Sequence, residues 1–369
     1  MTQSTHSGTS VHMALENGNK EWKLAFGDGR HEREVTIPAR NQVRLWKEIA
    51  ATKIKFGLPA DTPTFSCYEA GRDGFWIHRM LLQGGVQNIV VDPASIETNR
   101  RARRVKTDRL DARKLRSMLI RHWVGGERKH WRVLHVPTAE EEAARRPHRE
   151  AERLKNERLQ HLVRIRSLLV LHGINPRTVR IAPERWKDWK GDELPKEVVA
   201  ELSREQERLK AVDQQLKGLE QARRQKVKTP QTRAQQMAVK LQRIKAVGAE
   251  TAWNLSHEFF GPRDFKNRRE VGSAAGLTGC PYASGDSQRE QGISKAGNAR
   301  VRTWLIELSW RWLWMQPNSE LSKWYQRRFG SGGKRQHRIG IVALARRLLI
   351  AMWRYLEWDI LPEGAVARG

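Results

Sequence analysis

Four acidic residues stand where their carboxylates could meet. Glu16 and Glu69 each end a segment that reads as a β-strand. Asp108 and Asp111 are three residues apart in a basic segment that reads as a helix, so they share one helical face. Magnesium prefers oxygen ligands, and a site for two such ions needs carboxylates from several elements. Strand ends that face a helix can supply them, so these residues form a candidate magnesium site.

The surroundings of the two aspartates are strongly basic. Residues 100–121 hold ten lysines and arginines. One interpretation is local charge balance, because a lone carboxylate is usually solvated or caps a helix. The other is that the basic residues carry a phosphodiester strand to metals held beside them. The candidates for that role are Arg101, Arg104, Lys106 and Arg109.

A serine in the last third of the chain is a candidate nucleophile. Ser284 precedes a glycine in the segment 281–287, and a serine in such a flexible turn can present its hydroxyl to a substrate. The run 292–298 follows, and Asn298 can cap a helix from Ala299 to about Trp314, whose free N–H groups favour phosphate. Fixed positive charge comes from Lys295, Arg300 and Arg302. From the residues alone, an ordinary polar loop and helix start remains the alternative.

Charge and composition narrow the class of protein. The 369 residues include 69 Lys and Arg against 41 Asp and Glu, a formal net charge of +28, which attracts phosphate backbones. A membrane surface is the alternative partner, but no run of about 20 apolar residues could span a bilayer. The polar segment 1–10 lacks the core of a signal peptide, and two cysteines, Cys67 and Cys280, cannot build a disulfide framework. We therefore expect a reduced, cytoplasmic protein.

The elements that would position the acids lie in residues 1–137. Predicted strands are 11–15, 21–26, 33–37, 64–68 and 88–91, and predicted helices are 42–54, 75–82 and 107–122. Asn17-Gly18 predicts a hairpin turn between the first two strands. Three antiparallel strands followed by a helix–strand–helix–strand pattern predict a mixed sheet flanked by helices, an α/β domain.

Residues 138–228 predict a helical arm. One long helix is expected from Ala139 to His172, and a second carries a heptad seam that only Glu205 interrupts. The seam consists of Val198, Leu202, Leu209, Val212, Leu216 and Leu219. The connection 174–196 joins the two helices. A coiled-coil dimerisation arm and a plain spacer both fit this pattern.

Residues 229–369 predict a mainly α-helical domain with a glycine-rich middle. Within it, the segment 241–252 resembles a helix-hairpin-helix, in which backbone N–H groups at a glycine turn hold a phosphate. Ala246 stands where the first glycine is usual. The match is therefore partial.

Several ordered motifs together resemble the DEDD transposases of the insertion-sequence-110 family. They are Cys67-Tyr68-Glu69-Ala70-Gly71, Val91-Asp92-Pro93, the run from Lys106 to Ala112, and the Ser-Gly turn with Gly-Ile-Ser-Lys-x-Gly-Asn. The resemblance extends from residue 11 to about 355. It implies an N-terminal domain of the ribonuclease H type, in its Holliday-junction-resolvase form. The four magnesium-binding acids fall on Glu16, Glu69, Asp108 and Asp111. The first is commonly Asp, so Glu16 departs from the pattern and Asp92 is the substitute.

The resemblance also implies a reaction and its partners. It places a catalytic serine at Ser284, with Ser287 as the second choice, in a C-terminal transposase domain. The implied function is DNA strand exchange through a phosphoserine intermediate, with two magnesium ions. The implied partners are donor DNA, target DNA, a structured guide RNA and further copies of the chain, as a dimer or tetramer. We expect such a protein near the bacterial nucleoid.

Two other classes of function stay open at this point. One is a resolvase-like, metal-dependent nuclease that uses water as its nucleophile. The other is a non-catalytic RNA- or DNA-binding protein. A covalent protein–DNA adduct would distinguish a transposase with a serine nucleophile from both of these classes.

Overall fold

The fold is taken from a computed structural model of the chain. It describes residues 9–96, 108–126, 131–284 and 287–368; for residues 94, 108–111, 281–284 and 287–291 the backbone alone is described. The chain divides into two compact units, Met1–Val136 and Pro137–Gly369. None of the helices in the described residues is long and apolar enough to cross a bilayer.

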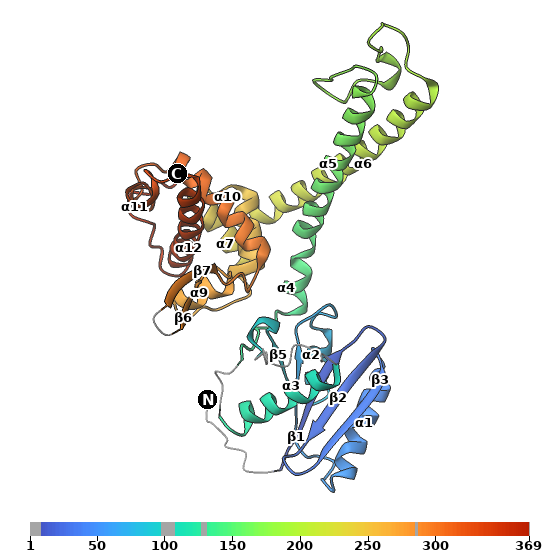
Figure 1. Ribbon diagram of the computed structural model, residues 1–369, viewed down its shortest axis with the longest axis vertical. Helices are drawn as coiled ribbons and strands as arrows, with labels where there is room; N and C mark the ends of the chain where they lie inside the picture. Colours follow the sequence, from blue (N-terminus) through green and yellow to red (C-terminus); the bar gives the residue numbers. More distant parts are fainter. Residues whose placement is uncertain (1–8, 97–107, 127–130, 285–286, 369) are drawn as a thin grey trace. The chain divides into compact units, whose positions relative to one another are not determined.

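A mixed five-stranded sheet organises the first unit. Its strands are β1 (Val11–Asn17), β2 (Glu21–Gly27), β3 (Glu32–Pro38), β4 (Thr64–Glu69) and β5 (Gln87–Val91). Their order is β3-β2-β1-β4-β5 (Figure 1). The first three pair antiparallel, whereas β4 is parallel to both β1 and β5. The predicted mixed sheet is therefore present, with each strand within two residues of its expected position.

Helices cover both faces of this sheet, as alternation along β1 requires. Val11, Met13 and Leu15 pack against α1 (Gln42–Lys55) and α2 (Trp76–Gln83). The intervening Ala14 belongs instead to the core of α3 (Asp108–Trp123). The short helix η1 (Pro93–Ser95) follows β5. The α/β prediction for this part of the chain is confirmed.

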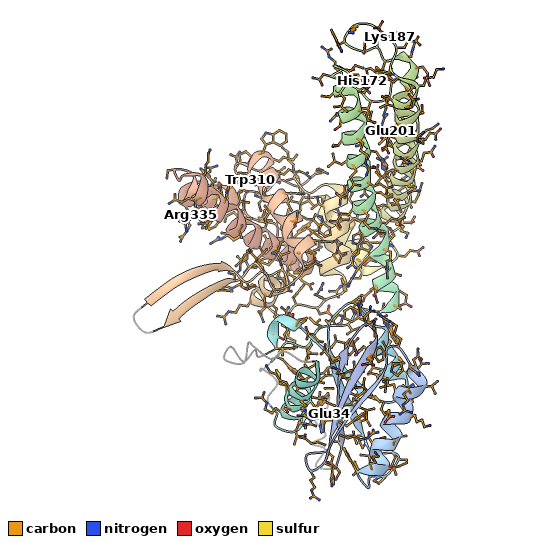
Figure 2. The ribbon with its side chains drawn as sticks, turned by 45° about the vertical axis from the view of Figure 1, so that its right-hand side comes forward. Glu34, His172, Lys187, Glu201, Trp310 and Arg335 are labelled. Carbon is orange, nitrogen blue, oxygen red and sulfur yellow. The ribbon has the colours of Figure 1, made fainter. Side chains whose placement is uncertain are left out.

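Two antiparallel helices, α5 (Arg146–Val170) and α6 (Lys196–Lys228), begin the second unit. Their connection contains η3 (Pro183–Arg185), and His172 and Lys187 lie at the end of the pair that is away from α4 (Figure 2). Ile165 and Leu169 pack against Leu202, and the buried Glu205 lies 2.6 Å from His161 Nδ1. The one polar position of the predicted seam is thus matched by a buried histidine.

The expected single helix 139–172 was wrong in one respect. It is divided at Arg145 into α4 (Ala139–Ala144) and α5. Pro147 has no N–H to donate and fits only the first turn of a helix, where it stands in α5. Thr138 and Glu141 form a capping box at the start of α4.

The rest of the second unit is mostly helical, as expected. Its elements are α7 (Arg233–Gln242), α8 (Ala249–Leu255), the π-helical turn η4 (Ser256–Phe260), α9 (Arg268–Ala274), α10 (Ala299–Met315), α11 (Glu320–Phe329) and α12 (Lys334–Trp358). They share one core that includes Phe259, Leu305, Trp312 and Leu348.

A β-hairpin inside this helical unit was not expected. It consists of β6 (Gly279–Ser284) and β7 (Ser287–Ile293), which pair antiparallel. The predicted flexible turn 281–287 therefore lies mostly within strands. The polar run 287–291 lacks alternating apolar residues, so its pattern does not indicate a strand. The Gly-Asp pair at 285–286 is the sequence signal that favours a hairpin.

Candidate functional site

Glu16 and Glu69 lie level with each other at the carboxyl ends of two adjacent parallel strands, as the next-to-last residue of β1 and the last residue of β4. Leu15 pairs with Tyr68 across β1 and β4, so the next residue on each strand is one of these glutamates. Both side chains are half-buried. Residues two apart on a strand face the same side, and two positions earlier Ala14 and Cys67 pack against α3. Both carboxylates therefore belong to the face that α3 covers.

Helix α3 runs in a direction that brings its first turn to the end of the sheet where Glu16 and Glu69 lie. Ala112 near its start lines a small pocket with Lys23 and Thr36, and Lys23 pairs with Glu16. Near its end, the ring of Trp123 lies 4.7 Å from the ring of Phe65, at the opposite end of β4. Helix α3 therefore runs against β1 and β4. The backbone of Asp108 and Asp111 forms its first turn, on the side of the two glutamates.

Asp92 lies at the same edge of the sheet. It follows Val91, which pairs with Glu69 across β4 and β5. Its backbone N–H donates to the carbonyl of Arg132 at 2.9 Å, and its carboxylate is 4.0 Å from Nη1 of that arginine. The residue named as a substitute for Glu16 is thus one strand further along the edge.

These carboxylates have the chemistry of a magnesium site. Glu16 and Glu69 offer oxygen donors from two strands, and the first turn of α3 brings a third element. Among the described side chains, no three His, Cys, Asp or Glu residues are grouped closely enough to hold a metal ion. The side chains of Asp108 and Asp111 fall outside that description.

The candidate serine is carried by the hairpin. Ser284 is the last residue of β6 and pairs with Ser287, the first residue of β7. After β7, the N–H of Ser294 donates to the carbonyl of Thr278 at 2.8 Å. Gly297, with φ of +124°, lies so close that a Cβ would be 2.4 Å from the carbonyl oxygen of Ala274. Only glycine fits at this position.

Asn298 caps α10, as the sequence predicts. Its Oδ1 accepts hydrogen bonds from the N–H groups of Arg300 and Val301. Those two donors, which were expected to be available to phosphate, are therefore used within the protein.

The three cations predicted beside this helix differ in their contacts. The guanidinium of Arg300 pairs with Glu152 at 2.7 Å. Nη1 of Arg302 donates to the carbonyls of Ala275 and Gly297, which holds the loop before α10. Lys295 is exposed and adopts a φ of 55°. Of the other predicted cations, Arg109 is described only as backbone in α3, and Arg101, Arg104 and Lys106 lie outside the described residues.

A buried carboxylate that the sequence analysis missed lies beside Asn298. Glu258, in the π-helical turn, is fully buried. Burial alone would raise its pKa, but hydrogen bonds from His148 and Arg149 of α5 outweigh that effect and hold the pKa far below its usual range. Nδ2 of Asn298 also donates to Glu258 at 3.4 Å. π-helical turns are frequent at functional sites, but their sequences carry no periodic signal.

The backbone conformation of Ala246 is compatible with the partial helix-hairpin-helix match. Ala246, between α7 and α8, has a φ of 92°, the left-handed region that favours glycine. The N–H of the preceding Lys245 donates to the carbonyl of Val366, and Gln316 donates to the carbonyl of Lys245. These hydrogen bonds tie the turn to the segment near the end of the chain.

Comparison with known proteins assigns the chain to a family. Residues 238–326 match the family described as Transposase IS116/IS110/IS902. A candidate transposase of Sinorhizobium fredii, y4rJ, is 37% identical over 377 residues, covering 97% of this chain and 95% of the relative. A second candidate transposase of that organism, y4qE, is 27% identical, covering 75% and 67%. The transposase for insertion sequence element IS1328 of Yersinia enterocolitica is 23% identical, covering 62% and 66%. The chain belongs to the IS116/IS110/IS902 family of transposases.

Proposed function

We propose that this transposase exchanges DNA strands by transesterification, with acids on the first unit and a serine on the second. One observation carries the proposal: Glu16 and Glu69 stand level on adjacent parallel strands, on the face where α3 begins. The proposed metal ligands are Glu16, Glu69, Asp108 and Asp111, with Asp92 as the substitute for the first. The proposed nucleophile is Ser284.

The arrangement of the first unit favours a ribonuclease H type of domain. Three antiparallel strands are followed by two strands parallel to β1, and helices cover both faces. The acids stand at the carboxyl ends of β1 and β4. Carboxylates that converge from different elements are what a site for two magnesium ions requires.

The proposed reaction balances without an external energy source. The Oγ of Ser284 forms a bond to phosphorus, and one ester bond between that phosphorus and a sugar oxygen breaks. The serine proton passes to the departing sugar oxygen by way of solvent. A sugar hydroxyl of the incoming strand then attacks the phosphoserine, and the bond between phosphorus and the serine Oγ breaks. The proton of that hydroxyl passes to the serine by way of solvent, so a phosphodiester is restored and the serine is freed. Magnesium, when bound, would supply a Lewis acid that polarises the phosphate.

The protein residues supply positions and charge. Glu16 and Glu69 would hold metal at the carboxyl ends of β1 and β4. The hairpin that carries Ser284 is followed by the segment 294–298, which is hydrogen-bonded to Thr278 through the N–H of Ser294. The serine and the acids belong to different units of the chain. The proposal therefore requires both units, from one copy or two, to act on the same phosphodiester.

The proposed partners are donor DNA, target DNA, a structured guide RNA and further copies of the chain. The net charge of +28 supports polyanionic partners. We assign the helix pair α5–α6 as a coiled-coil arm for dimerisation. The exposed Leu159, Val163 and Val170 on α5, spaced by four and seven residues, support that role.

A covalent adduct tests the nucleophile. Wild-type protein incubated with magnesium and its element's DNA should yield a protein–DNA adduct that survives denaturing electrophoresis. Ser284→Ala should lose both adduct and strand exchange but keep DNA binding. Ser287→Ala and Ser294→Ala are the matched controls and should retain the adduct. Cleavage without any adduct in the wild-type protein would show that water is the nucleophile in place of serine. Loss of the adduct in Ser287→Ala alone would identify Ser287 as the nucleophile.

A further inference from the structure

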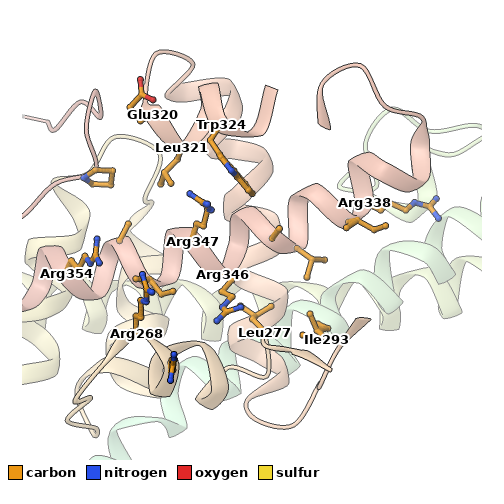
Figure 3. A pocket seen from close by; sticks show the side chains of 18 of the residues that line it. Arg268, Leu277, Ile293, Glu320, Leu321, Trp324, Arg338, Arg346, Arg347 and Arg354 are labelled. Carbon is orange, nitrogen blue, oxygen red and sulfur yellow. The ribbon is translucent and has the colours of Figure 1, made fainter. Parts of the chain in front are cut away.

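The second unit contains an arginine-lined groove that none of the proposed chemistry uses. Its volume is about 1150 Å³, and it lies between α9, α11, α12 and the segment near residues 360–363. In Figure 3, Arg338, Arg346, Arg347 and Arg354 follow one another along α12, with Trp324 on one side and Arg268 on the other.

The two faces of α12 have different roles. Residues such as Leu344, Leu348 and Met352 are buried in the core of the unit. The opposite face lines the groove with side chains three or four positions apart, the spacing of one helical stripe. That stripe consists of Arg335, Arg338, Ile339, Val342, Ala343, Arg346, Arg347, Ile350, Ala351 and Arg354. At 1.5 Å per residue, the arginines along it extend over about 28 Å.

The charge of the groove is one-sided. Besides the five arginines of α12, it is lined by Arg268, Arg269 and Lys295, against only Glu320 and Glu363. Glu320 already pairs with Lys323 and Arg327. Among the described residues, no carboxylate lies within ion-pair distance of the groove's arginines. Instead, the guanidinium of Arg347 lies 3.9 Å from the ring centroid of Trp324. This uncompensated charge is complementary to a row of phosphates.

The floor of the groove is apolar. Ile339 is 53% exposed and Ile360 is 58% exposed, and Val342 and Ile350 lie between the arginines. A duplex turns its bases inward and offers mainly phosphates to such a surface. An unpaired strand also offers the faces of its bases, which pack on apolar side chains and stack on aromatic rings and guanidinium planes.

We propose that this groove binds an unpaired strand of DNA, with its phosphates on the arginines of α12 and a base against Trp324 and Arg347. Gly279, Gly292 and Ile293 line the groove where β6 begins and β7 ends. A strand bound along α12 therefore reaches the base of the hairpin that carries Ser284. The choice of DNA rests on the proposed function, whereas the groove itself requires neither the serine nor the acids.

Binding of a labelled 20-nucleotide oligothymidine to the full-length protein tests the proposal. The triple variant Arg338→Gln/Arg346→Gln/Arg354→Gln should raise Kd at least tenfold at physiological salt. It should also reduce the slope of log K against log salt by about 2, since each phosphate contact on a single strand contributes about 0.7. Trp324→Leu should raise Kd roughly tenfold and leave the slope unchanged. With 5-iododeoxyuridine in the strand, ultraviolet light should crosslink the wild-type protein at Trp324.

The matched control removes the same charge elsewhere on the second unit. Arg166, Arg177 and Arg204 are exposed residues of α5, the interhelical connection and α6. Their triple change to Gln should leave Kd within about threefold. An equal loss of oligothymidine affinity in both triple variants would show that binding depends on charge spread over the surface and would overturn the assignment to the groove. A groove variant with normal oligothymidine binding but an altered oligomeric mass would identify a protein surface instead.

Competitor strands identify the occupant. The triple arginine variant should lose the most affinity for single-stranded DNA. An equal or larger loss of affinity for duplex DNA or RNA of the same length would overturn the choice of an unpaired DNA strand. Ser284→Ala and Asp108→Asn should bind oligothymidine like the wild type. If the groove variants bind oligothymidine normally, the proposed chemistry is therefore unaffected. If the wild-type protein forms no covalent adduct, the proposed groove is likewise unaffected.

Discussion

Arg149 and Glu258 form a two-pronged ion pair between α5 and the π-helical turn, with Nε 2.6 Å from Oε1 and Nη2 2.9 Å from Oε2. His148 Nε2 lies 2.9 Å from the same Oε1. The carboxylate is fully buried, and it also accepts from the residue that caps α10. The side chain of Glu258 thus links the first turn of α5 to the loop that follows the hairpin carrying Ser284.

Replacing this buried acid should destabilise the second unit strongly. Glu258→Gln leaves Arg149 and His148 facing a neutral amide, and removing one partner of a buried pair costs about 3–5 kcal/mol. The measurement is urea denaturation at pH 7, followed by tryptophan fluorescence. Glu250→Gln is the control, since Glu250 pairs with Lys155 and both side chains are about half exposed. That change should cost less than about 1 kcal/mol. Equal effects of the two substitutions would contradict a structural role for the buried pair.

His257, next to this acid, should make stability depend on pH. The side chain stacks on Trp253 at 3.9 Å between ring centroids, and burial lowers its pKa from 6.5 to about 4. A histidine with a depressed pKa favours the folded state above pH 6.5, and that contribution is lost as the pH falls from 6.5 to 4. The loss is on the order of 3 kcal/mol.

The variant His257→Gln isolates this effect. The difference in unfolding free energy between wild type and variant, measured at each pH, should shrink between pH 6.5 and 4. Taking the difference removes the contributions of His12 and His78, whose pKa values burial also lowers. Glu258 acts in a lower window, because its depressed pKa makes its contribution disappear only below about pH 4.5. A difference that stays constant between pH 6.5 and 4 would show that His257 is not responsible.

The sequence predicts the first unit well because its signals are local. Alternation along the strands, the Asn17-Gly18 turn and the helical spacing of the apolar residues in α3 each depend on neighbours in the chain. The level placement of Glu16 and Glu69 follows from the parallel pairing of β1 with β4, which length and pattern alone do not fix. Their places at the ends of predicted strands selected those two glutamates, and the motif Cys67–Gly71 shared with the family supports Glu69.

Features that depend on distant partners were not predictable in the same way. Glu258 is a charged residue in an apolar stretch, and its partner Arg149 is 109 positions away. The groove on α12 requires the helix to be buried on one face only, yet apolar residues and arginines are mixed along its sequence. The break at Arg145 does have a local signal, since Pro147 favours a helix start.

A structured RNA should bind more tightly than duplex DNA of matched length, given the proposed guide RNA. Competition against a labelled RNA from the element's non-coding end, at physiological salt, measures this preference, because salt removes most non-specific ionic binding. We expect the specific RNA to displace the label at a concentration at least tenfold lower than a scrambled RNA or a duplex does. Equal displacement by all polyanions would favour a non-specific basic surface.

Removal of single carboxylates at the sheet edge should separate catalysis from DNA binding. Asp108→Asn and Glu69→Gln each remove a proposed ligand but leave the basic segment around α3 unchanged, so cleavage in magnesium should be lost while DNA affinity stays within about threefold. Titration calorimetry with Mg²⁺ should show weaker metal binding in both variants, independently of turnover. The matched control is Glu21→Gln, at the exposed start of β2, which should cleave normally. Glu16→Gln and Asp92→Asn should differ from each other, because only the one that supplies the remaining ligand should abolish cleavage. Normal cleavage and normal metal binding by Asp108→Asn would show that the first turn of α3 does not belong to the metal site.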